Sequence, residues 1–540
     1  MADEILDTSD ISLLYPDENT LRAGPAGAAL AEHDAKELEF DRLIDLKSCD
    51  LGEFFTADAE VIRYRQETFA DMMRSPELSD VLRRMIPILG DITELRHLEN
   101  DASLSAESYL YSITEVELYT TLLENLKTGL LSIEDRLESR AFRAFAARIR
   151  MLTQSEYYDR LNQKLAELTR RVREIKSVTI GVNLDARLRP DTAGLLAVNN
   201  EPFKSGEVLD KILRMDFKND EMTCIAPLVP YRKTMTENAQ TAMENALYGA
   251  IGDVFKTSIK AWKKIVQMYV LENTDFLLRM LPEIEFVTKA TELLCRLRDR
   301  GCRLCTPTLA AKEEKKLSFR NLENPVVALK TTATLVPNDI TFDENGMIDV
   351  LTGPNRGGKS VLTSGVGLAT IMAQLGLPVT ADEAVISPVD TVLTHFPTGS
   401  EDTIDKGRLG EECARIDVMF GKVTEQSLVL LDEALSSTGS YEGAYIAAEV
   451  LQGFSIARCR GIFSTHLHDL AADLDRLNES CQAAGGVAID SLVAAMADGT
   501  RSFKIRRAKP DGKSYARDIA EKYGLSLPKI LEKVGRGKEE

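Results

Sequence analysis

Apolar positions in the first half of the chain follow a helical period over two long stretches without proline. In the first stretch, residues 114–165 are strongly helical in pattern, with a stripe of Tyr119, Leu122, Leu126, Leu130, Ile133 and Leu137. Residues 231–281 repeat this spacing with Ala239, Ala242, Met243, Ala246, Leu247 and Ile251. The stripes predict core-facing sides of two long helices, about 100 residues apart, that run out and back as levers.

Between the helical stretches the pattern becomes that of strands. Residues 177–182 alternate and are β-branched, and short apolar runs at 195–198 and 223–228 are bounded by glycine and proline. We therefore expect a small β-rich insertion. The expected domains are a helical region at 1–176, the insertion at 177–231, returning helices at 232–318, and a last domain at 319–540.

In the last domain, an apolar run at 347–351 leads into LTGPNRGGKS, residues 351–360, which fits the phosphate-loop pattern G-x-x-x-x-G-K-[ST]. Glycines let backbone N–H groups turn toward phosphate oxygens, and the following helix adds partial positive charge. Lys359 is expected to reach the β- and γ-phosphates of ATP, and Ser360 to bind Mg2+. The residues expected to contact the nucleotide are Gly353, Pro354, Asn355, Gly357, Gly358, Lys359, Ser360 and Val361.

Two further apolar runs end in polar residues, as buried parallel strands do at the edge that binds ligands. The run at 427–431 is followed by Asp432 and Glu433. Asp432 is placed to hold Mg2+, and Glu433 to act as the catalytic base that polarises the attacking water. The run at 461–464 precedes His466, which could sense the γ-phosphate or orient water. An exposed acidic strand end and a purely structural histidine are the alternatives.

The motifs of the last domain resemble the ATPase domain of the MutS mismatch-repair family. They are TGPNRGGKS, then ADEAVISPVD (381–390), LVLLDE (428–433), STGSYEGAYIA (437–447), FSTH (463–466) and SYARDIAEKYGLSLP (514–528). The segment 58–89 resembles the helix that opens the family's lever region. The resemblance implies an α + α/β fold, with a long-helix lever region and a small β clamp insertion followed by an ABC-type P-loop ATPase domain. It also implies that Asn338 lies near the nucleotide base, that ATP and Mg2+ are cofactors, and that DNA and a second subunit are partners.

The sequence departs from the family pattern at several places. The family completes each site with an S-T-F-x-x-E signature from the opposite subunit, whereas residues 405–412 here read DKGRLGEE, and no Ser or Thr occurs between Thr403 and Thr424. We therefore expect slow hydrolysis and an altered two-subunit site. About 60 residues precede the lever-like region, without the family's Phe-x-Glu reading element, so direct mismatch reading is not expected.

Charge and composition narrow the function classes. A net charge of −19 argues against a general nucleic-acid-binding protein. Residues 131–176 carry 11 Lys/Arg against 7 Asp/Glu, and residues 501–540 carry 12 against 6, so DNA contacts or solvated helix charge are both open. No apolar run reaches the roughly 18 residues of a membrane span, and no hydrophobic targeting segment is seen. We expect a cytoplasmic protein.

These observations favour an ATP-dependent DNA-binding protein of the MutS type. It would be a clamp driven by ATP and Mg2+, a homodimer through its ATPase domain, acting in DNA repair or recombination without reading mismatches directly. A clamp on a ribonucleoprotein or protein partner, or a weakly hydrolysing nucleotide-binding scaffold, is the alternative. The sequence leaves the nucleic-acid substrate, the oligomeric state and the partner proteins open.

Overall fold

The chain divides into two compact units in a computed structural model. The first comprises Met1–Ile11, Pro76–Leu137 and Phe142–Ile284, and the second comprises Ser12–Ser75, Glu138–Ala141 and Glu285–Glu540. The four predicted domains stay predictions. The described residues are 11–23, 27–101, 106–156, 158–163, 165–166, 176–188, 190–202, 204–205, 223–224, 275–397, 407–467, 470, 473–497, 500–509, 521 and 523–536. The helix predicted at 239–251 lies outside them.

The first unit is built on the helix pair α4 (Pro76–Asp101) and α5 (Ala106–Gly129). The predicted apolar stripe is confirmed as core, because each of its six residues is at most 4% exposed. The single helical stretch expected over 114–165 is wrong, since η3 (Leu131–Arg136), a 3₁₀ turn, and α6 (Arg140–Thr153) follow α5 separately. The break starts at Gly129, where glycine weakens the helix and a Cβ would lie 2.5 Å from Val81 Cγ2.

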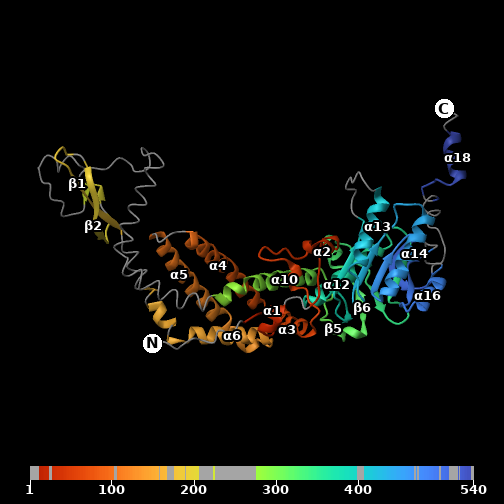
Figure 1. The fold of residues 1–540 in the computed structure, drawn as a ribbon, viewed down its shortest axis with the longest axis horizontal. Helices are drawn as coiled ribbons and strands as arrows, with labels where there is room; N and C mark the ends of the chain where they lie inside the picture. Colours follow the sequence, from red (N-terminus) through yellow and green to blue (C-terminus); the bar gives the residue numbers. More distant parts are fainter. Residues whose placement is uncertain are drawn as a thin grey trace. The chain divides into compact units, whose positions relative to one another are not determined.

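A two-stranded antiparallel ribbon also belongs to the first unit. It pairs β1 (Ser177–Leu184) with β2 (Pro190–Asn199), which lie side by side in yellow in Figure 1. The alternating pattern at 177–182 therefore predicted a strand correctly. Two short strands follow, β3 (Lys204–Ser205) and β4 (Thr223–Cys224), and the rest of the predicted run at 223–228 lies outside the described residues.

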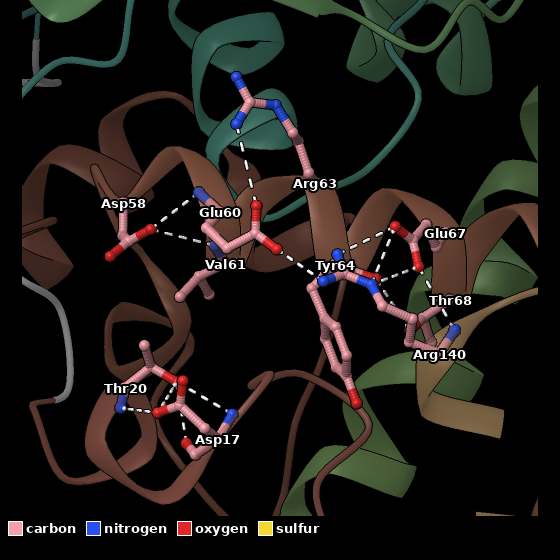
Figure 2. A network of polar contacts seen from close by, with 10 residues as sticks. All are labelled: Asp17, Thr20, Asp58, Glu60, Val61, Arg63, Tyr64, Glu67, Thr68 and Arg140. Atoms are coloured by element: carbon pink, nitrogen blue, oxygen red, sulfur yellow. Dashed lines mark hydrogen bonds and ion pairs between the residues drawn. The ribbon is translucent and has the colours of Figure 1, made fainter. Parts of the chain in front are cut away.

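The second unit includes helix α3 (Ala59–Arg74), which holds the four-residue segment Glu138–Ala141. The Asp71 carboxylate accepts hydrogen bonds from the backbone N–H groups of Glu138 and Ser139, at 3.0 and 2.8 Å. Arg140 pairs with Glu60 and Glu67 on the exposed side of α3, as Figure 2 shows. Its guanidinium also lies 5.1 Å from the centre of the Tyr64 ring. The segment is thus fixed to α3 by side chains from three helical turns.

The main sheet of the second unit has six strands in the order β10-β11-β12-β8-β13-β14. The first five are parallel and β14 is antiparallel. Their bounds are β8 (Ile348–Thr352), β10 (Val392–His395), β11 (Leu428–Asp432), β12 (Arg460–Ser464), β13 (Ile489–Ala497) and β14 (Thr500–Arg507). The three apolar runs predicted as buried parallel strands are β8, β11 and β12, and every residue of these strands is buried.

Helices cover both faces of this sheet, as strands that are apolar on both sides require. Helix α12 (Lys359–Gln374) packs on one face, where a Cβ on Gly367 would lie 2.6 Å from Leu430 Cδ1. Helix α14 (Ser440–Ala457) packs on the other face, because its residues share a core with Val429 and Leu431. Residues alternate between faces along a strand, so α12 and α14 lie on opposite sides of the sheet.

A second sheet in this unit has the strand order β5-β9-β6-β7. Its strands are β5 (Thr308–Leu309), β6 (Leu317–Leu322), β7 (Asn338–Phe342) and β9 (Glu383–Ile386). The other helices among the described residues are α1 (Glu18–Ala23), α2 (Glu32–Glu37), α10 (Leu281–Asp299), α11 (Pro325–Lys330), α13 (Gly407–Phe420), α16 (Leu474–Ala483) and α18 (Leu527–Arg536), with 3₁₀ turns at Phe40–Arg42, Leu51–Phe54 and Lys312–Glu314. The structure therefore mixes helices with parallel and antiparallel sheets, as expected.

Candidate nucleotide site

The phosphate-loop sequence forms the connection between β8 and α12. Two of its glycines adopt backbone angles that favour glycine, with φ of 141° at Gly353 and 94° at Gly358. A Cβ on Gly353 would also lie 2.7 Å from Ala494 Cβ, so the loop passes β13 too closely for any side chain. Gly358 then caps α12, whose first residue is Lys359. The sequence thus places a glycine turn and a helix N-terminus at the end of a buried strand.

Lys359 folds back across this loop. Its Nζ donates to the backbone carbonyls of Gly353 at 3.1 Å and Pro354 at 3.3 Å. Burial lowers the pKa of Lys359, while the carboxylates of Glu433 and Asp432 oppose that change. The ammonium group is therefore held by two neutral carbonyls inside the loop, where an anionic ligand such as a phosphate would stabilise its charged form.

Asp432 and Ser360 are positioned together beneath the loop. Asp432 ends β11, and burial raises its pKa, with the Ser360 and Ser464 hydroxyls nearby opposing the rise. Among the described residues, no hydrogen bond reaches its buried Oδ1 atom. A buried carboxylate oxygen without a partner, next to a hydroxyl, fits the oxygen ligands that Mg2+ prefers.

Glu433 and His466 are in direct contact. His466 Nε2 lies 2.7 Å from Glu433 Oε1, and His466 Nδ1 lies 3.5 Å from Lys359 Nζ. A neutral imidazole with its proton on Nε2 satisfies both contacts, because Nδ1 can then accept from the ammonium. Glu433 has a φ of 49°, and its backbone N–H donates to Ser464 O at 2.8 Å. The structure therefore brings three of the predicted residues together, from just after β11, just after β12 and the start of α12.

A cavity of about 520 Å³ opens beside these residues. It is large enough for a small-molecule ligand. Its lining includes the predicted residues Asn338, Gly357, Gly358, Lys359, Ser360, Val361 and Glu433. The other predicted residues lie outside that lining, namely Gly353, Pro354, Asn355, Asp432 and His466.

Asn338, expected near the base, supports the cavity wall. Its Nδ2 donates to Phe503 O at 3.0 Å, and its Oδ1 accepts from Ile505 N–H at 2.7 Å. Both amide ends therefore bond to β14, and the cavity faces Phe503, which the sequence reading did not single out. Phe503 has a φ of 57° and stays 44% exposed. A large aromatic residue in this conformation is uncommon and often marks a functional site.

Comparison with known proteins gives two matches that together extend over most of the chain. The family model for MutS domain V matches residues 349–533, and that for the MutS2 N-terminal domain matches residues 57–319. The chain belongs to the MutS family. The first match begins in β8 and includes the phosphate loop, Asp432, Glu433, His466 and Phe503, whereas Asn338 lies before it.

Individual relatives match only parts of this MutS-family chain. The DNA mismatch repair protein MutS of Roseiflexus castenholzii is 33% identical over 226 residues, covering 40% of this chain and 20% of the relative. That of Chloroflexus aurantiacus is 30% identical over 328 residues, covering 57% and 32%. The probable DNA mismatch repair protein Msh6 of Drosophila melanogaster is 35% identical over 171 residues, covering 31% and 14%. The chain thus spans about a third or less of the length of these relatives.

Two further stretches that the sequence analysis singled out can be located in the structure, namely residues 405–412 and the basic stretch 131–176. The first stretch, which stands where the family has its S-T-F-x-x-E signature, forms the start of α13 from Gly407 onward. Glu412 in this helix accepts a hydrogen bond from Ser437 Oγ at 3.1 Å. Residues 398–406 lie outside the described part of the chain. In the basic stretch 131–176, each of the six arginines that the structure describes has a contact within the protein, namely Arg136, Arg140, Arg143, Arg148, Arg150 and Arg160. Arg170, Arg171 and Arg173 lie outside the described residues.

A search of the described helices finds none that is both long enough and apolar enough to span a bilayer.

Proposed function

We propose that this protein is a MutS-type ATPase that binds DNA as a clamp controlled by ATP and Mg2+. The observation that supports it most is that His466 contacts both Lys359 and Glu433, two residues that line the cavity. These are a cation for phosphate oxygens, a carboxylate for water and an imidazole between them, which together suit phosphoryl transfer to water.

Each group would act through contacts already formed or close by. Lys359 would exchange its two loop carbonyls for the β- and γ-phosphate oxygens. Ser360 and Asp432 would hold Mg2+, which neutralises charge on the phosphates. Glu433 would orient the attacking water, and His466 would steady its carboxylate by donating from Nε2. Phe503 offers an aromatic face on the cavity wall for the base.

DNA and a second subunit are proposed as partners because of the family resemblance, and not because of contacts in the structure. The relatives are named as DNA mismatch repair proteins, which supports DNA as the partner. The proposal has three further parts. The protein would form a homodimer through an ABC-type P-loop ATPase domain, would be located in the cytoplasm, and would act in repair or recombination without reading mismatches directly. Because no Ser or Thr occurs between Thr403 and Thr424, we propose slow turnover.

The test is equilibrium binding of full-length Glu433→Ala protein, with ATP and Mg2+, to labelled homoduplex, mismatched and four-way-junction DNA at a stated salt concentration. Glu433→Ala is expected to retain ATP and to bind at least one DNA form tightly. Lys359→Ala should lose ATP binding, and with it any ATP-dependent DNA binding. If Lys359→Ala retained tight ATP binding, the phosphate-loop assignment would be wrong.

A second candidate is a nucleotide-driven clamp on a ribonucleoprotein or protein partner. The arginines favour it, because the six described ones in the stretch 131–176 already have contacts within the protein and the chain carries a net charge of −19. Failure of the Glu433→Ala protein to bind all three DNA forms, with ATP retained, would select this candidate. ATP bound with little turnover in the wild type, together with no ATP-dependent binding of DNA or of another partner, would point to a nucleotide-binding scaffold.

A further inference from the structure

The end of the β1–β2 ribbon is a tight, ordered turn. Pairing of the two strands closes at Leu184 and Pro190. Beyond it, the Asp185 carboxylate accepts from Arg187 N–H at 2.8 Å, and Leu188 N–H donates to Asp185 O at 2.9 Å. Asp185 thus fixes the backbone of the residues that follow it, as aspartate does in turns.

This turn presents a leucine to solvent in an unfavourable conformation. Leu188 has a φ of 60° and is 79% exposed. A left-handed backbone costs a non-glycine residue about 1–2 kcal/mol. A side chain this exposed makes few packing contacts, so leucine at this position does not stabilise the fold. Residues 183–188 are all exposed, and Leu184 at the base of the turn adds a second exposed apolar side chain.

The charge beside Leu188 suits a phosphate-bearing partner. Arg187 precedes it and is exposed, and the sequence places Arg189 directly after it. Two arginines in a six-residue tip, DARLRP, stand out in a chain with a net charge of −19. An apolar side chain between arginines is the composition of wedges that enter between DNA base steps, and a two-stranded ribbon is narrow enough for a groove.

We propose that the tip of the β1–β2 ribbon is a DNA wedge, in which Leu188 enters between neighbouring base pairs while Arg187 contacts the flanking phosphates. This inference rests on the proposed function only in assuming that the partner is DNA. The wedge would unstack and bend the duplex at its contact point, most easily at pyrimidine–purine steps.

The experiment uses the full-length Glu433→Ala protein with ATP, Mg2+ and a duplex that carries 2-aminopurine at its TA steps, because unstacking raises the fluorescence of this base. Leu188→Asn removes the apolar side chain and keeps a residue that tolerates positive φ. It should abolish the fluorescence rise and weaken binding about tenfold, the effect of about 1.4 kcal/mol of lost apolar contact. Arg187→Gln should lower the slope of log affinity against log salt by about 0.9.

Leu196→Ala is the matched control, because Leu196 is a 71% exposed leucine on β2, away from the tip. It should keep both the fluorescence rise and the affinity. An equal fluorescence rise in Leu188→Asn would overturn the wedge, and so would DNA binding by the parent protein without any rise. Either result would leave the proposal of DNA binding intact and would point to a protein as the partner of the tip. Absence of DNA binding by the parent protein would overturn the DNA proposal itself.

Discussion

Replacement of Asp349 by asparagine should stabilise the protein at neutral and alkaline pH. Asp349 is in β8, four positions before Gly353, and is 0% exposed. Among the described residues, neither carboxyl oxygen has a hydrogen-bond partner. Arg507 Nη2 is 3.9 Å away, but its guanidinium already pairs with Asp343 at 3.0 Å and Asp490 at 2.9 Å. Burial, together with the charges of Asp490 and Asp343, raises the pKa of Asp349 to about 8, against the attraction of Arg507.

The sign and size follow from proton linkage. In the unfolded chain Asp349 loses its proton near pH 3.9, whereas the folded protein keeps it to about pH 8. Between these values the folded state binds one more proton, so stability falls as pH rises, by about 1.4 kcal/mol per pH unit. Above about pH 8 both states are ionised and the loss levels off, at about 6 kcal/mol at most. Asparagine has a similar shape and no charge, so the variant should lack this term.

The assay is urea denaturation of wild type and Asp349→Asn, followed by circular dichroism from about pH 5 to 9. The advantage of the variant should grow with pH and become constant above about pH 8. Asp490→Asn is the control, since it removes a carboxylate from Arg507 but leaves Asp349 buried, and it should keep most of the wild-type pH dependence. A difference between wild type and Asp349→Asn that does not change with pH would refute the reasoning, because Asp349 would then be ionised in the folded protein.

Three further predictions follow from buried or cavity-lining groups. Burial, together with the charge of Arg415, lowers the pKa of His395 to about 4, so protonation of His395 opposes folding. The wild type should therefore lose up to about 3 kcal/mol of unfolding free energy between about pH 6.5 and 4, and His395→Leu should not show this loss in the same urea series. Phe503→Ala should weaken ATP binding about tenfold in calorimetry if the base stacks there, whereas a Phe503→Tyr protein should bind as wild type. Asp71→Ala should cost about 2–3 kcal/mol of unfolding free energy by leaving two backbone N–H groups unpaired, and Asp71→Asn should recover part of it.

The sequence alone predicted the structural features that depend on the pattern of apolar residues within a short segment. Although Asp349 and Arg460 are also buried in β8 and β12, the strands β8, β11 and β12 are mainly apolar runs, so their burial follows largely from composition. The same holds for the buried stripe in the helical region. The interruption after Gly129 was missed because the apolar spacing continues through it, although the backbone hydrogen bonding does not.

Features set by tertiary contacts could not be predicted. Phe503 faces the cavity because Asn338, 165 residues away in sequence, bonds its backbone. The arginines of the stretch 131–176 had the composition of a DNA-binding surface, yet Arg140 is fixed by Glu60 and Glu67 of α3. Charge counted along a sequence does not distinguish a cation that faces solvent from one that already has a carboxylate.

Helix α12 connects the candidate site to the helical segments of the second unit. It begins at Lys359 in the phosphate loop, and at its other end the buried Gln374 side chain donates to Thr56 O, just before α3, and to Val389 O, each at 2.9 Å. Gly376 follows with a φ of 85°, at a point where a Cβ would lie 2.3 Å from Arg65 Cβ on α3. There is no room for α12 to shift without moving α3, because close-packed interiors transmit displacement. Since α3 also holds Glu138 and Ser139 through Asp71, one continuous series of contacts runs from the phosphate loop to the segment where the chain passes between its two units.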